Sequence, residues 1–170
     1  MTAPRKRPPY TGDERTQLLG WLDMQRAIIA WKCDGLSEAD AHRSLLATSP
    51  LMTAAGVVSH LRWVEYLWFE VVLLGRPAQG PPFEDGPEDA DMMVEGIPLA
   101  HLLAEYDRQC VVSNEIVAAH SLDDMGRHPD FTDSAATLRW ILFHMIEETA
   151  RHAGHLDTIR ELLDGEKGYY

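Results

Sequence analysis

Four long segments of the chain place apolar residues at spacings of three and four, and this periodicity most limits the possible folds. The segments run from about residue 12 to 34, 52 to 74, 98 to 120 and 134 to 164. A period near 3.6 residues is that of an α-helix buried along one face. No strand-like alternation separates the segments. The sequence therefore predicts an all-α fold, an antiparallel four-helix bundle.

Capping residues and glycines indicate where these helices begin and end. Thr11 with Glu14 resembles a capping box ahead of the first helix, and Ser134 is a good N-cap for the fourth. Gly35 and Gly75 predict the ends of the first and second helices. Ser37 to Asp40 offers one more capping pattern, which indicates a short extra turn of helix.

Residues 76–98 are rich in proline, glycine and acidic side chains, and they show neither a helical nor a strand period. We expect a long crossover loop here, between the second and third helices. Loops of this length inside a compact domain are usually functional or disordered. Asp89, Asp91 and Glu95 could ligate a cation, but we interpret them as solvated loop charge.

The length of 170 residues fits one domain spanning 1–170, with residues 1–10 as a mobile basic arm. The formal charge of −12 argues against nucleic acid and anionic lipid as partners. The sequence has no signal-peptide pattern and no membrane-spanning apolar run, so we expect a cytoplasmic protein. Cys33 and Cys110 are too far apart in sequence for a zinc knuckle, and free thiols are preferred to a disulfide.

The fourth helical segment carries a polar interruption in its inward-facing stripe. In steps of three and four, the stripe contains Leu138, Ile141, Met145, Glu148, His152, His155 and Ile159. A buried carboxylate loses several kcal/mol of hydration unless it has a partner. Glu148 and His152 are four residues apart and share one face of the helix, so a divalent cation could bind both.

The third ligand should come from a facing helix, and His60 lies on the broad apolar face of the second helix. Two imidazoles and one carboxylate suit zinc first, with nickel, iron or manganese as alternatives. Two other interpretations stay open: His60 as an ordinary core residue, and Glu148 with His152 as a plain helical ion pair. His144 is a further ligand, a partner of a ligand, or a proton carrier, whereas His155 better fits a partner of a ligand.

Two stretches resemble the DinB-like superfamily of four-helix-bundle metalloproteins. They are Val58-Ser-His60-Leu-Arg-Trp-Val-Glu65 and His144-Met-Ile-Glu-Glu148-Thr-Ala-Arg-His152-Ala-Gly-His155-Leu-Asp157. The resemblance covers nearly the whole chain and implies metal ligands at His60, Glu148 and His152. Many members have histidine where this chain has Glu148. The His, Glu, His version is similar to the mycothiol-dependent branch, which includes maleylpyruvate isomerase and the S-transferases, and the short chain looks more like the S-transferases.

The resemblance implies a metal-dependent thiol S-transferase with mycothiol as co-substrate. The metal-activated thiolate would attack a small electrophile, as in detoxification, with His144 as the candidate residue for moving a proton. Another metal-dependent hydrolase or isomerase, or a non-catalytic metal-binding bundle, stays open as an alternative. The five tryptophans and the broad apolar face of the second helix indicate a homodimer.

Overall fold

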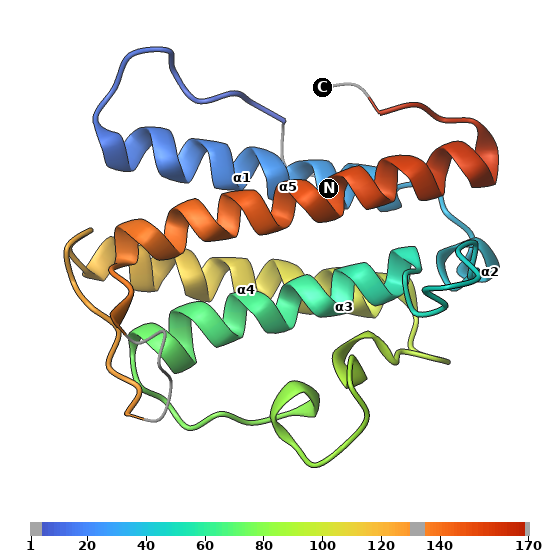
Figure 1. Ribbon diagram of the computed structural model, residues 1–170. Coiled ribbons are helices and arrows are strands. Elements are labelled where there is room, and N and C mark those ends of the chain that lie inside the picture. Colours follow the sequence, from blue (N-terminus) through green and yellow to red (C-terminus); the bar gives the residue numbers. More distant parts are fainter. Residues whose placement is uncertain (1–4, 130–134, 169–170) are drawn as a thin grey trace. The chain divides into compact units, whose positions relative to one another are not determined.

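The computed structural model describes residues 5–129 and 135–168, and this part of the chain is all helical (Figure 1). The α-helices are α1 (Glu14–Cys33), α2 (Glu38–Ala41), α3 (Ala54–Glu65), α4 (Leu99–Ala119) and α5 (Leu138–Asp164). A π-helix, η1 (Tyr66–Leu73), continues α3, and the short 3-10 helices η2 (Pro81–Phe83) and η3 (Ala90–Met92) precede α4. Within the described ranges no strand forms, and an isolated bridge joins Met125 to Thr137. The predicted fold class, all-α, is confirmed.

By their internal contacts the residues divide into two compact units. One comprises Met1–Val57 with Leu142–Tyr170, and the other comprises Val58–Ile141. None of the described helices has the length and apolar character needed to cross a membrane.

In the first unit, α1 and the part of α5 from residue 142 onward lie side by side (Figure 1). Arg160 of α5 donates hydrogen bonds to the backbone oxygens of Lys32 (2.8 Å) and Asp34 (3.0 Å), at the end of α1. The Lys32 side chain is fully buried, and its Nζ lies 2.9 Å from Oδ1 of Asp157. Apolar side chains that are buried along the two helices include Leu18, Leu22, Ile29, Leu142, Met145, Leu156 and Ile159.

Asp13 caps the N-terminus of α1, two residues after the predicted cap. Its carboxylate accepts a hydrogen bond from the backbone N–H of Thr16 at 2.8 Å. This bond and a second one from the Thr16 hydroxyl hold the pKa of Asp13 below its ordinary value. The capping box predicted from Thr11 and Glu14 was therefore wrong in register, although the helix starts within two residues of the expected place.

Of the predicted N-terminal arm, residues 5–10 are described and contain no helix, whereas residues 1–4 lie outside the described residues. The Arg5 guanidinium stacks 3.7 Å above the ring of Trp31. Pro8 lies so close to Gly20 that a Cβ on that glycine would come within 2.6 Å of it. Residues 5–8 thus lie along α1.

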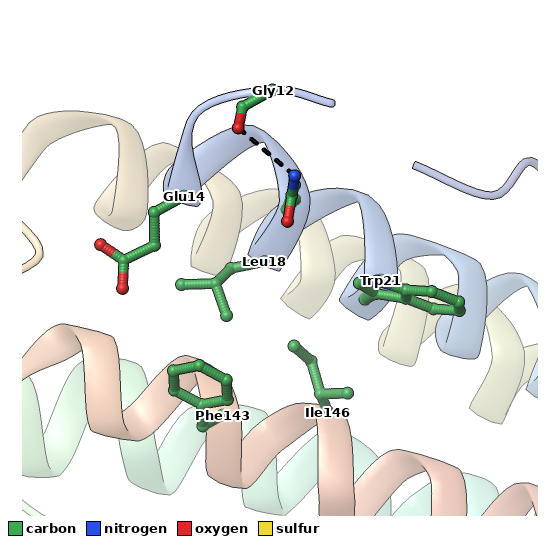
Figure 2. A pocket seen from close by; sticks show the side chains of 7 residues that line it. Gly12, Glu14, Leu18, Trp21, Phe143 and Ile146 are labelled. Atoms are coloured by element: carbon green, nitrogen blue, oxygen red, sulfur yellow. Dashed lines mark hydrogen bonds between the residues drawn. The ribbon is translucent and has the colours of Figure 1, made fainter. Parts of the chain in front are cut away.

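An apolar pocket opens between α1 and α5 in the first unit (Figure 2). Leu18 and Trp21 line it from α1, and Phe143 and Ile146 line it from α5. Gly12 and Gln17 also line it, and the Gln17 side chain donates a 3.3 Å hydrogen bond to the Gly12 backbone oxygen.

In the second unit, η1 packs beside α4. The side-chain amide of Gln109 donates a 2.8 Å hydrogen bond to Glu70, and Arg76 pairs with the other carboxylate oxygen of Glu70. The sequence predicted one α-helix to residue 74, so the π-helical geometry of residues 66–73 is a correction. π-Helical turns are wider than α-helical ones and are rare, and they are often found at functional sites.

Gly75 ends this helical segment, as predicted. Its φ of +72° is in the left-handed region that favours glycine, and a Cβ there would come within 3.2 Å of the Arg127 backbone. The backbone N–H of Arg127 in turn donates to the Val72 oxygen at 2.9 Å. The connection from α4 to α5 therefore contacts the last residues of η1.

The fourth predicted helix begins at Leu138 in the structure, and its proposed cap, Ser134, lies outside the described residues. The apolar members of its inward stripe, Leu138, Ile141, Met145 and Ile159, are all buried. The predicted periodicity of this helix is therefore confirmed.

Both cysteines are free thiols, and Cys33 should resist alkylation in the folded protein. Burial raises the pKa of the Cys33 thiol to about 12, so at pH 8 almost none of it is the reactive thiolate. We expect iodoacetamide to label half-buried Cys110 well before Cys33, and both equally fast in urea. Peptide mass spectrometry over a time course measures this, and equal rates in the folded protein would contradict it.

Candidate metal centre

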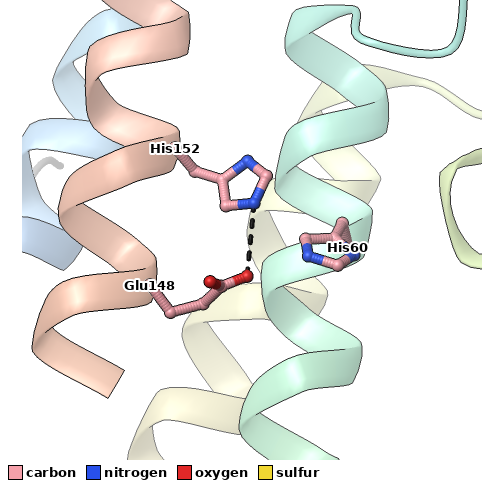
Figure 3. A group of neighbouring side chains, drawn as sticks. All are labelled: His60, Glu148 and His152. Atoms are coloured by element: carbon pink, nitrogen blue, oxygen red, sulfur yellow. Dashed lines mark ion pairs between the residues drawn. The ribbon is translucent and has the colours of Figure 1, made fainter. Parts of the chain in front are cut away.

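Glu148 and His152 come from successive turns of α5 and point from the same face of the helix (Figure 3). Nε2 of His152 lies 3.3 Å from Oε1 of Glu148. The Glu148 side chain is 18% exposed and the His152 side chain is 11% exposed, so both are largely removed from solvent. As the sequence predicted, the spacing of four residues brings a carboxylate and an imidazole to the same part of the helix surface.

His60 comes from α3, where its Nδ1 lies 2.7 Å from Oδ2 of Asp91. Asp91 is in η3 and is 9% exposed, so its interpretation as solvated loop charge was wrong. Its neighbours Asp89 and Glu95 are exposed. A carboxylate accepts hydrogen bonds, so the contact favours a proton on Nδ1 and leaves the Nε2 lone pair available.

His60, Glu148 and His152 form a group that could hold a metal ion (Figure 3). Each offers one ligand atom, and these atoms all lie within 4.8 Å of one another. Ligands bound to zinc at about 2.0–2.2 Å must lie within about 4.4 Å of each other. The spacing of the three ligand atoms is close to this limit.

His155 lies on α5, three residues after His152. The two Nδ1 atoms are 3.4 Å apart, and the rings meet edge to face with centroids 5.1 Å apart. Burial, followed by the charges of His152 and Arg151, holds the pKa of His155 below its ordinary value. A neutral His155 ring can accept a hydrogen bond from Nδ1–H of His152, which leaves the Nε2 lone pair of His152 directed toward Glu148.

His144 lies one turn before Glu148 but is not part of the donor group. Its Nδ1 is 3.7 Å from Oε2 of Glu147, on the same helix, and its side chain is 26% exposed. The structure thus places His144 in a partly accessible position beside a carboxylate.

Sequence reasoning missed the role of Asp91, which sits in an acidic loop without a regular period. A signal for it exists in the apolar residues that follow. Met92 and Val94 are 7% and 6% exposed, so this part of the loop packs against the protein. The apolar run marks this part of the loop as packed, but it does not distinguish Asp91 from the exposed Glu95 on its other side.

Most of the chain matches a protein-family model. The family model described as mycothiol-S-transferase matches residues 17–165, a range that contains all three candidate ligands and Asp91. A search of curated proteins gives no match.

Proposed function

Because the chain belongs to the mycothiol-S-transferase family, we propose that it joins the sulfur of mycothiol to small electrophiles with the help of a divalent metal ion. The observation that carries the metal dependence is the grouping of His60, Glu148 and His152. The donor set fits zinc, with nickel, iron or manganese as alternatives. His60 and His152 would bind through Nε2, since Asp91 and His155 occupy their Nδ1 atoms.

When bound, the ion supplies positive charge that lowers the pKa of a coordinated thiol and favours its thiolate. The Glu148 carboxylate offsets part of that charge, whereas the two imidazoles are neutral ligands. The thiol proton would leave to solvent, and the sulfur would form a bond to carbon as the carbon–halogen bond of an alkyl halide breaks and halide leaves. With an activated alkene, a proton must reach the neighbouring carbon, and we propose that His144 carries it.

We also propose that α1, α3 with η1, α4 and α5 form the antiparallel four-helix bundle expected of the family, in one domain of residues 1–170. The long Pro/Gly-rich segment between η1 and α4 would be its crossover loop. A cytoplasmic location, a homodimer and a role in detoxification remain predictions. Light scattering of the purified protein tests the dimer.

A conjugation assay tests the activity. Protein stripped of metal, and the same protein reloaded with Zn²⁺, would be mixed with mycothiol and a fluorogenic alkyl chloride. We expect product to form above the uncatalysed rate only with metal, and to stop when a chelator is added. The same assay with His144→Gln and an activated alkene tests the proton carrier, which predicts slower turnover without weaker Zn²⁺ binding.

Two outcomes would contradict the proposal. Equal turnover by metal-free and reloaded protein would remove the metal from the reaction. Tight Zn²⁺ binding without thiol consumption, for any electrophile offered, would favour a hydrolase, an isomerase or a non-catalytic metal-binding bundle.

A further inference from the structure

We propose that Asp91 is a positioning residue for metal binding: it holds the His60 imidazole in the tautomer and orientation that a metal ion needs. The inference rests on the proposed metal site and adds a residue outside the donor group. It also assigns a role in metal binding to the loop between η1 and α4.

The contact between the two residues has the properties of a strong, directional hydrogen bond. The distance from Nδ1 of His60 to Oδ2 of Asp91 is 2.7 Å, which is within the range of bonds to ionised carboxylates. The side chains are 23% and 11% exposed, so water competes for the bond only weakly. A neutral imidazole can carry its proton on either nitrogen, and this partner selects Nδ1.

Asp91 is itself held in place by the residue before His60. The Ser59 hydroxyl donates a hydrogen bond to the Asp91 backbone oxygen at 2.5 Å. Two consecutive residues of α3 therefore contact one loop residue, the first at its backbone and the second at its carboxylate. This double contact fixes the direction from which the carboxylate approaches the imidazole.

Other contacts hold the loop against α3 and η1 on either side of Asp91. The Tyr66 hydroxyl donates to the Pro77 oxygen at 2.9 Å, and Gly80 lies directly against the Trp63 ring, where a Cβ would come within 2.2 Å. Buried Met92 and Val94 follow Asp91. The carboxylate is thus presented from an anchored segment, as a preorganised partner of a ligand must be.

A partner of this kind affects metal binding in two ways. It removes the entropy cost of orienting the ring when the metal arrives, and its negative charge makes the imidazole a better electron donor. Loss of such a partner typically weakens metal binding about 10–100-fold. Glu95 offers a matched control, because it is an exposed carboxylate four residues further along the same loop.

The test compares Asp91→Ala, Asp91→Asn and Glu95→Gln with the parent, with Zn²⁺ as the probe. Competition with a chromogenic chelator measures the affinity, and thermal unfolding of the metal-free proteins checks the fold. We expect Asp91→Ala to bind Zn²⁺ about 10–100-fold more weakly. We expect a smaller loss for Asp91→Asn, whose amide oxygen still accepts the bond, and no loss for Glu95→Gln.

A second readout is the ¹⁵N chemical shift of the His60 ring in metal-free protein, which reports which nitrogen carries the proton. The parent and Asp91→Asn should show the proton on Nδ1, and Asp91→Ala should show a mixture. A role for Asp91 in stability alone would leave this tautomer unchanged.

The outcomes separate this inference from the proposed site. Parent-like affinity in Asp91→Ala, with binding lost in His152→Ala, would overturn the positioning role and leave the site intact. Parent-like affinity in both variants would overturn the site and the inference together. A loss in Asp91→Ala as large as in His152→Ala would make Asp91 a ligand and would also overturn the positioning role.

Discussion

Glu148→Ala should bind Zn²⁺ more than about 100-fold more weakly than the parent, because it loses a ligand, and loss of a ligand's hydrogen-bonding partner alone costs about 10–100-fold. The variant also loses the negative charge that offsets part of the cation's charge. The metal-free variant should fold at least as well as the parent, since Glu148 is largely buried and its carboxylate is costly to desolvate.

Two measurements check this expectation. Competition with a chelator gives the affinity, and thermal unfolding with and without Zn²⁺ gives the stabilisation by binding. At a Zn²⁺ concentration of about 100 Kd the parent should gain about 2.7 kcal/mol, while Glu148→Ala gains almost nothing. Glu161→Ala, which removes an exposed carboxylate from the same helix, is the control and should behave like the parent. Undiminished Zn²⁺ stabilisation of Glu148→Ala would exclude Glu148 as a ligand.

Asp157→Asn should be the most destabilising of the charge-neutralising substitutions considered for the first unit. It removes the carboxylate that pairs with the Lys32 ammonium, which is fully buried. Removing one partner of a fully buried pair costs about 3–5 kcal/mol, and we expect the low end because Asp157 is 40% exposed and asparagine still accepts a hydrogen bond. For a chain of this size, a loss of about 3 kcal/mol corresponds to a fall in Tm of roughly 6–12 °C.

Removing the lysine should destabilise the protein less than neutralising the aspartate. Lys32→Met removes the buried charge and keeps most of the apolar stem, so it should cost less than Asp157→Asn, and the double variant should recover most of the loss. Urea unfolding of the three proteins measures the differences, with Glu161→Gln as the control for loss of a charge on α5. A larger loss in Lys32→Met than in Asp157→Asn would show that the ammonium is stabilised without Asp157.

The helices could be predicted because their evidence is local. Apolar residues at spacings of three and four located α1, α3, α4 and α5, and Gly75 marked the end of η1 within two residues. Where prediction missed, neighbouring signals competed: Thr11 and Asp13 can both cap α1, and only the fold selects Asp13.

Part of the candidate site could also be predicted, and the reason is again spacing. Glu148 and His152 are four residues apart on one helix, so the helix alone brings them together. The contact between His60 and Asp91 joins residues 31 apart through a loop without a period, so no local rule predicts it. Burial of Glu65 and Glu70 was missed for another reason, because they are five residues apart and an α-helical period does not place both inward.

The π-helical turns of η1 limit how many amino acids this stretch of the chain can hold. Deleting any one residue between 66 and 69 would allow the backbone to return to α-helical geometry, in which each residue advances the helix by about 100°. Residues after the deletion would then be rotated relative to those before it, and Glu70 would no longer meet Gln109. Single-residue insertions and deletions should therefore be tolerated far less here than substitutions, even where the residue removed is solvent-facing.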